Sequence, residues 1–82
     1  MRIKPLRDEL INYLRQRGLF KHWEKRKFLF EQNPKLPGLN TELLEPKHLK
    51  IYSFRLTQKY RVIFIYAGNQ EIEVIDINDH YK

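Results

Sequence analysis

The fold is decided by residues 51–77, which read IYSFRLTQKYRVIFIYAGNQEIEVIDI. Three segments of this stretch, 51–57, 60–66 and 71–77, are rich in the β-branched and aromatic residues that strands favour. The connections between them are short, and residues 67–70 have the composition of a turn. Because strands joined by such short connections pair antiparallel, the stretch predicts a three-stranded antiparallel meander.

The register of the first two strands decides where two arginines point. A two-residue loop would place Leu56 opposite Arg61 and bring an arginine onto the core face. An odd loop or a bulge would place Leu56 opposite Val62, and the apolar faces of the two strands then agree. The same loop places Thr57 opposite Arg61. Because the hydrophobic pattern sets register, we expect this second arrangement, with Arg55 and Arg61 together on the face away from the core.

Two helices are predicted ahead of the strands, over about residues 5–17 and 19–32, after a very short first strand at Ile3. In the first helix, apolar residues recur at three- and four-residue spacing. Gly18 is a suitable C-terminal cap for it, and Pro34 ends the second helix. The order of elements predicts an α+β fold in which a two-helix hairpin packs on one face of a small sheet.

Residues 33–46 hold three of the four prolines and read as a long ordered loop. We expect its leucines to pin this loop to the core.

Length and composition exclude several classes of protein. The 82 residues fit a single domain, 1–82, and no cysteine is present to form a disulfide or a thiolate metal site. The three histidines have no metal-ligand spacing, so we expect no metal and no cofactor. No apolar run is long enough to span a membrane and no signal peptide is visible, so we expect a cytoplasmic protein.

The charge is strongly positive and unevenly distributed. Sixteen Lys and Arg stand against ten Asp and Glu, for a net charge of +6. Residues 46–70 contain basic residues and no acidic one. Such a distribution is typical of a protein that binds a polyanion or an acidic partner.

Three pieces of the sequence resemble the RelE/ParE toxin superfamily of type II toxin–antitoxin systems. Residues 51–65, IYSFRLTQKYRVIFI, are similar to its middle strands, in which an aromatic–x–x–Arg strand and a short turn precede Tyr-Arg and an apolar run. Residues 33–49, NPKLPGLNTELLEPKHL, resemble its connector. Residues 75–81, IDINDHY, resemble the closing strand and His-Tyr ending of the YoeB-like branch. The resemblance therefore implies a RelE-like fold.

The resemblance also implies an activity and partners. It implies a ribosome-dependent mRNA endonuclease that inhibits translation by metal-independent cleavage of RNA. The implied partners are a cognate acidic antitoxin and the ribosome with its mRNA. One alternative is a ParE-like gyrase poison, and another is a non-catalytic basic module that binds RNA or the antitoxin. The terminal His-Tyr favours the nuclease, because a gyrase poison needs no proton-transfer residues.

Candidate site residues follow from the same resemblance. Arg61 matches the arginine that stabilises the charge on the scissile phosphate, a role suited to its planar, permanently charged guanidinium. His80 and Tyr81 match the residues for proton transfer and base stacking. The connector carboxylate is Glu42, with Glu45 as its competitor. The candidates for binding the RNA backbone are Lys47, His48, Lys50, Arg55 and Lys59.

Overall fold

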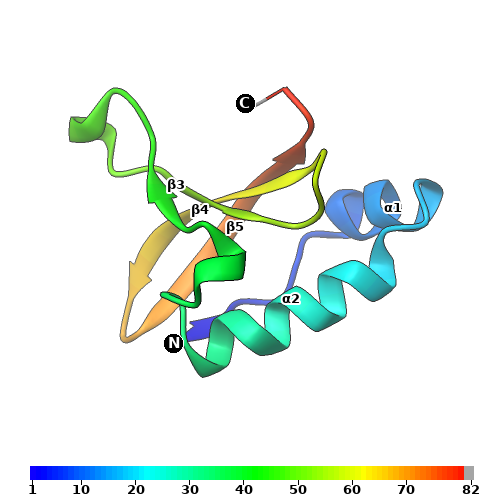
Figure 1. Ribbon diagram of the computed structural model, residues 1–82, viewed down its shortest axis with the longest axis horizontal. Helices are drawn as coiled ribbons and strands as arrows, with labels where there is room; N and C mark the ends of the chain where they lie inside the picture. The colour runs from blue at the N-terminus through cyan, green and yellow to red at the C-terminus, as the bar shows by residue number, and fades with distance from the viewer. Residues whose placement is uncertain (81–82) are drawn as a thin grey trace.

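The computed structural model describes residues 1–80, which form two α-helices on one face of a five-stranded mixed sheet (Figure 1). The elements are β1 (Arg2–Ile3), α1 (Asp8–Gln16), α2 (Phe20–Gln32), the 3₁₀ turn η1 (Pro37–Leu39), β2 (Glu42–Leu43), the 3₁₀ turn η2 (Lys47–Leu49), β3 (Tyr52–Arg55), β4 (Arg61–Gly68) and β5 (Glu71–Asn78). The strand order is β1-β5-β4-β3-β2, and β1 alone runs parallel to its neighbour. Across residues 1–80, no helix combines the length and the apolar character needed to cross a membrane.

The predicted α+β architecture of two helices on a β3–β4–β5 meander is confirmed. The first helix begins at Asp8, three residues later than the sequence predicted from Pro5. The reason lies in β1, because the Lys4 amide still donates to the Ile72 carbonyl at 2.9 Å and keeps the chain extended. Gly18 ends this helix with a φ of 67°, as predicted, and the Leu19 amide donates to the Leu14 carbonyl.

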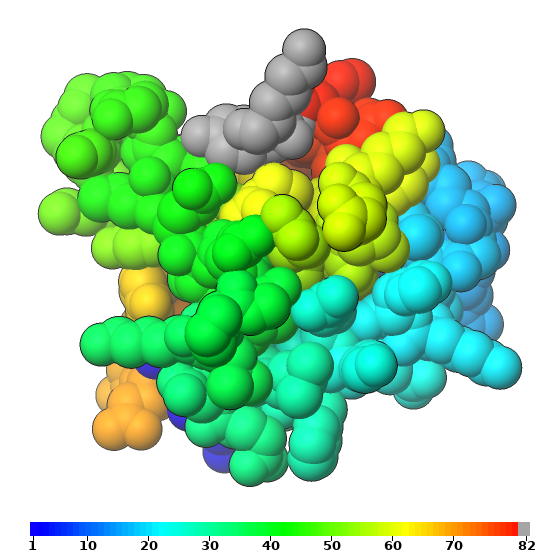
Figure 2. Space-filling model, viewed as in Figure 1, coloured from blue at the N-terminus to red at the C-terminus, as the bar shows by residue number. Residues whose placement is uncertain are grey.

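The segment 33–46 is more structured than the loop that the sequence predicted. It contains η1 and the strand β2, which pairs antiparallel with β3. Leu39 is completely buried, and the Leu44 amide donates to the Ile51 carbonyl at 2.8 Å. These long-range contacts create a strand where the local sequence has no alternating pattern. Beyond β2, residues 45–50 are exposed and project at the upper left of Figure 2.

The register of β3 and β4 confirms the predicted faces and corrects the predicted pairing. Phe54 pairs with Val62, and Arg55, not Thr57, stands opposite Arg61. The loop is a three-residue one, in which the amides of Leu56 and Thr57 both donate to the Tyr60 carbonyl. The Thr57 hydroxyl accepts from the Lys59 and Tyr60 amides, so a threonine supplies the turn that a glycine usually provides.

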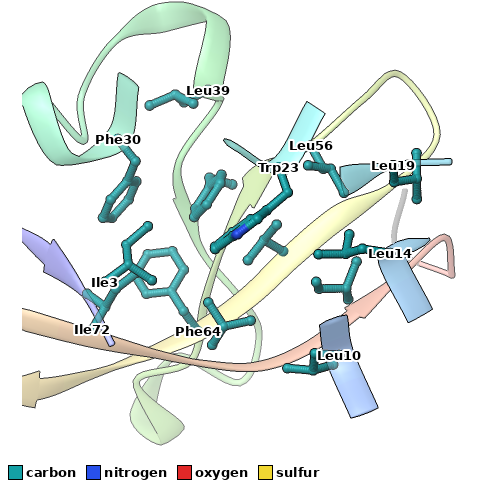
Figure 3. Packing of buried hydrophobic residues seen from close by; sticks show 14 residues of the cluster. Ile3, Leu10, Leu14, Leu19, Trp23, Phe30, Leu39, Leu56, Phe64 and Ile72 are labelled. Atoms are coloured by element: carbon teal, nitrogen blue, oxygen red, sulfur yellow. The ribbon is translucent and has the colours of Figure 1, made fainter. Parts of the chain in front are cut away.

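The core lies between the sheet and the helices and is organised around aromatic rings (Figure 3). Phe30 of α2, Phe54 of β3 and Phe64 of β4 are fully buried. The Phe30 and Phe54 ring centroids are 4.8 Å apart, and those of Phe30 and Phe64 are 5.3 Å apart. Because large rings bury much apolar surface per residue, three of them give a short chain a sufficient core.

Candidate functional site

The sheet face away from the helices carries the candidate residues in rows set by the strand register. The first row, across β3, β4 and β5, contains Arg55, Arg61 and Asn78. The next row, from β2 to β5, contains Glu42, Ser53, Ile63 and Asp76. Residues from distant parts of the sequence are therefore neighbours on one face of the sheet.

Arg61 is buried and held by polar contacts from two other segments. Only 9% of its surface is exposed. Its Nε donates to Ser53 Oγ at 3.0 Å, and its Nη2 donates to the Asn40 carbonyl at 2.6 Å. The same Nη2 lies 3.5 Å from Glu42 Oε1. These contacts fix the plane of a guanidinium whose charge never titrates.

The strand β2 brings Glu42 to Arg61. Glu42 pairs with Ser53 across β2 and β3, which places its carboxylate beside the guanidinium. Its side chain is 53% exposed and is therefore reachable from solvent. Glu45, the competing carboxylate, is exposed and lies beyond β2, next to Pro46. The geometry thus favours Glu42 as the partner of Arg61.

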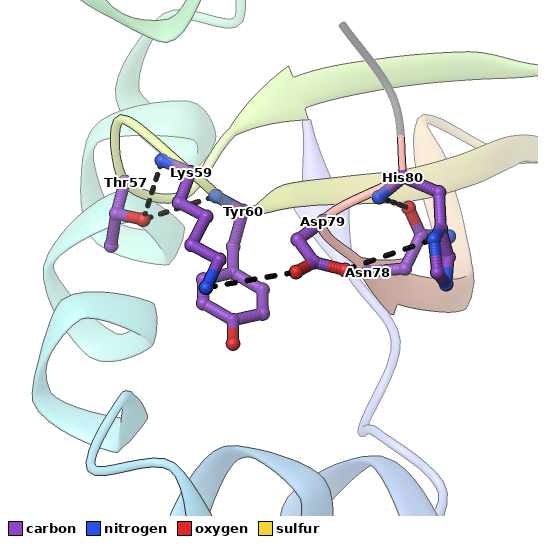
Figure 4. Close-up of polar contacts among 6 residues, drawn as sticks. All are labelled: Thr57, Lys59, Tyr60, Asn78, Asp79 and His80. Carbon is purple, nitrogen blue, oxygen red and sulfur yellow. Dashed lines mark hydrogen bonds and ion pairs between the residues drawn. The ribbon is translucent and has the colours of Figure 1, made fainter.

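His80 lies just past the end of β5, next to Asp79, which contacts Lys59 of the β3–β4 loop (Figure 4). Its Nδ1 is 3.9 Å from Asp79 Oδ1, and Asp79 Oδ2 is 3.8 Å from Lys59 Nζ. The His80 side chain is 89% exposed, and its backbone amide donates to Asn78 Oδ1 at 3.2 Å. His80 and Lys59 therefore share one carboxylate. Tyr81 lies outside the described residues.

A depression of about 400 Å³ lies on the same face of the sheet as Arg61. It is lined by Leu44, Ile51, Ile63, Ile75, Asp76, Asn78 and His80. Its floor is apolar and its polar groups come from β5 and His80, so it offers a surface for a flat, partly apolar group. Asn78 also pairs with Arg61, which makes the depression continuous with the arginine row.

The structure does not bring all of the predicted RNA-binding residues to one place. Arg55 ends β3, and Lys59 lies in the loop between β3 and β4. Lys47, His48 and Lys50 are exposed on or beside η2, which leads into Ile51 at the rim of the depression. Among residues 1–80, no group of three or more His, Cys, Asp and Glu side chains is arranged to hold a metal ion.

Two contact residues of Arg61 were missed by the sequence analysis. Ser53 could have been found, because it alternates with the core residues of β3 and shares the face of Arg55. Asn40 has a weaker signal, since an asparagine after Gly-Leu is suited to a left-handed turn but does not indicate what its carbonyl contacts.

Tyr13 of α1 contacts Tyr60, the residue just before β4. Its ring meets the Tyr60 ring edge-on at a centroid distance of 6.2 Å. Burial raises the pKa of the Tyr13 phenol above 10.0, and although Arg17 opposes the shift, Tyr60, Asp79 and Asp76 add to it. Burial, with a smaller effect from Tyr52, also raises the pKa of Tyr66.

We expect the free energy of unfolding of Tyr13→Phe to fall less at alkaline pH than that of the wild type. The folded chain holds the Tyr13 proton more tightly than the unfolded chain does. The resulting stabilisation is complete below the unfolded pKa of about 10 and is lost as the pH rises through the higher folded pKa. Urea unfolding of both proteins between about pH 9 and 11 measures this difference. The stability of the variant should still fall somewhat with pH, because the pKa of Tyr66 is also raised. Equal losses of unfolding free energy in both proteins would contradict the assignment.

Comparison of the sequence with known proteins gives a short match. No family model matches the chain. A segment of 34 residues is 50% identical to an uncharacterized protein of Haemophilus influenzae, and it covers 42% of this chain and 34% of that protein. The match thus spans about a third of that relative's length.

Comparison with solved structures finds likeness over nearly the whole chain. A YoeB/ParE toxin from Agrobacterium tumefaciens superposes with a TM-score of 0.71 and 16% identity, over 99% of this chain and 100% of that one. The YoeB dimer from Staphylococcus aureus gives a TM-score of 0.69 at 22% identity, over 98% and 94% of the two chains. A heterotetrameric YoeB-YefM toxin-antitoxin complex from the same organism gives 0.66 at 22% identity, over the same shares. At these identities the likeness concerns the fold.

Proposed function

Starting from the RelE/ParE, YoeB-like fold of this chain, we propose that it is the toxin of a type II toxin–antitoxin pair. We propose that it inhibits translation in the cytoplasm by cutting mRNA on the ribosome, without a metal ion. The observation that carries the proposal is a buried arginine, Arg61, fixed beside the exposed carboxylate of Glu42 on a sheet face that leads to His80.

The chemistry of RNA cleavage matches these three side chains. The 2′-hydroxyl attacks the adjacent phosphorus, and the bond from phosphorus to the 5′-oxygen breaks. A base must take the proton of the 2′-hydroxyl, and an acid must give a proton to the departing 5′-oxygen. Glu42 and His80 supply these two proton-transfer roles. The Arg61 guanidinium stabilises the negative charge that develops on the phosphorane oxygens.

Binding of the RNA chain falls to the basic residues around this face. Lys47, Lys50 and Lys59 are exposed and contact the phosphate backbone in this proposal, with Arg55 beside Arg61 and His48 on η2. Contacts of this kind are electrostatic, so the binding weakens as the salt concentration rises.

The proposed partner in the absence of the ribosome is an acidic antitoxin. The net charge of +6 supports a partner of opposite sign. The YoeB of the S. aureus complex, which shares this fold, is bound to YefM. An antitoxin that covers the Arg61 face would block access of mRNA to it.

Primer extension on a defined mRNA with purified ribosomes tests the proposal. We expect the wild-type protein to cut mRNA only when ribosomes are present. His80→Ala should lower cutting by roughly 10²–10⁴-fold, because it removes a proton-transfer group. His22→Ala is the matched control, since His22 is an exposed histidine on α2.

Two results would count against the proposal. Intact mRNA with the wild-type protein would contradict the nuclease, and inhibition of gyrase supercoiling would then favour the ParE-like alternative. Equal cutting by wild type and His80→Ala would remove His80 from the mechanism.

A further inference from the structure

Two like charges stand directly opposite each other on the candidate face. Arg55 of β3 and Arg61 of β4 are cross-strand partners. Like charges in such positions destabilise a sheet, because their side chains are nearest neighbours on one face. Glu42 lies near the Arg61 guanidinium, at 3.5 Å from Nη2. A group that accepts hydrogen bonds from both guanidinium groups would offset the repulsion between Arg55 and Arg61.

Asn40 is that group. Its backbone carbonyl accepts from Arg61 Nη2 at 2.6 Å. In the side-chain amide orientation that satisfies both of its polar atoms, Oδ1 accepts from Arg55 Nη2 at 2.7 Å. In that orientation Nδ2 donates to the Pro37 carbonyl at 2.9 Å, which fixes the amide plane. One residue therefore offers an oxygen to each guanidinium.

The position of Asn40 is itself fixed from both sides. It ends η1 in the left-handed conformation, with φ 46° and ψ 50°, which asparagine tolerates better than most residues. Arg26 of α2 donates to the Gly38 carbonyl at 3.3 Å and to the Leu56 carbonyl at 3.2 Å. The Thr41 hydroxyl donates to the Pro34 carbonyl at 2.7 Å. The turn that carries Asn40 is thus tied to α2, to the end of β3 and to its own preceding segment.

We propose that Asn40 is a positioning residue that holds Arg55 and Arg61 as a pair facing one phosphodiester group. This inference rests on the proposed function, because it assigns the arginine pair to RNA. Asn40 acts through the arginines and does not touch the reacting atoms. Because Asn40 already restrains Arg55, the Arg55 side chain loses little conformational entropy when the phosphate binds.

NMR of the arginine side chains tests the positioning without reference to activity. Restricted rotation of the Arg55 and Arg61 guanidinium groups is expected in the wild type. Asn40→Gly keeps the left-handed turn and the carbonyl but removes the amide, so only Arg55 should rotate freely. Asn40→Asp keeps an oxygen acceptor and should keep Arg55 restrained. Asn69→Gly is the matched control, because Asn69 is also left-handed, with φ 51°, in the β4–β5 turn.

A double-mutant cycle on mRNA cleavage tests the consequence. We expect Asn40→Gly to lower cleavage about tenfold where Arg55 is present, because a hydrogen bond to a charged group is lost. In an Arg55→Ala background, the same change should alter cleavage by less than about twofold.

The outcomes separate the two proposals. Free rotation of Arg55 in the wild type, or an equal effect of Asn40→Gly in both backgrounds, would overturn the role of Asn40. Absence of cleavage by the wild type would contradict the proposed nuclease, and the NMR comparison would still decide whether Asn40 holds the arginines.

Discussion

Arg61→Lys is expected to lower the rate of mRNA cleavage by roughly 10²–10³-fold, the effect of removing a donor that stabilises transition-state charge. Lysine keeps the positive charge but lacks the planar fork of N–H groups. A single ammonium cannot reproduce the bonds from Nε to Ser53 and from Nη2 to Asn40 while also facing a phosphate. The loss should appear in the single-turnover rate at saturating ribosomes more than in binding.

Arg15→Lys is the matched control, since Arg15 is exposed on α1 and its guanidinium stacks on the Phe20 ring. Circular dichroism of both variants should match the wild type, which separates loss of chemistry from loss of fold. Cleavage by Arg61→Lys within a few-fold of the wild type would mean that charge alone is sufficient at this position.

Phe54→Ala is expected to remove a large part of the protein's free energy of unfolding. The Phe54 ring is fully buried, and its centroid lies within 6.4 Å of those of Trp23, Phe30 and Phe64. Removing a buried phenylalanine costs about 3–5 kcal/mol. At about 0.05–0.15 kcal/mol per residue, a domain of 82 residues has roughly 4–12 kcal/mol of stability in total.

Phe28→Ala provides the comparison, because Phe28 is 62% exposed on α2. Its effect on the free energy of unfolding should stay within about 0.5 kcal/mol. Urea unfolding of the three proteins measures both effects, and the transition slope should be the same for the wild type and Phe28→Ala. Similar midpoints for the two alanine variants would contradict the assignment of Phe54 to the core.

Much of the fold was predictable because its signals are local. The glycine at position 18 and the Asn33–Pro34 pair mark where the helices end, within a residue or so. The alternation of Phe54, Leu56 and their polar neighbours placed Arg55 and Arg61 on the correct face. The predicted pairing, Thr57 with Arg61, differs from the observed pairing, Arg55 with Arg61, by two residues. Because side chains alternate between the two faces with a period of two, such a shift leaves every side chain on the predicted face.

The segment between α2 and β3 was less predictable for a physical reason. Residues 33–51 have no hydrophobic period, and their path depends on the burial of Leu39 and on pairing with β3. The strand β2 and the left-handed turn at Asn40 therefore did not appear in the sequence analysis. The parallel pairing of β1 with β5 is a contact of the same long-range kind.

The sequence by itself determined the α+β class, the C-terminal ends of the two helices, the three strands of the meander and the side of the sheet on which the arginines lie. The tertiary structure alone decided that Glu42, rather than Glu45, contacts Arg61. It also decided that the Asn40 carbonyl accepts from Arg61 and that Lys59 and His80 both lie near the Asp79 carboxylate. The physical reason is the range of the interactions. Periodicity and capping act over a few residues, whereas these contacts depend on how distant segments pack together, which no local pattern encodes.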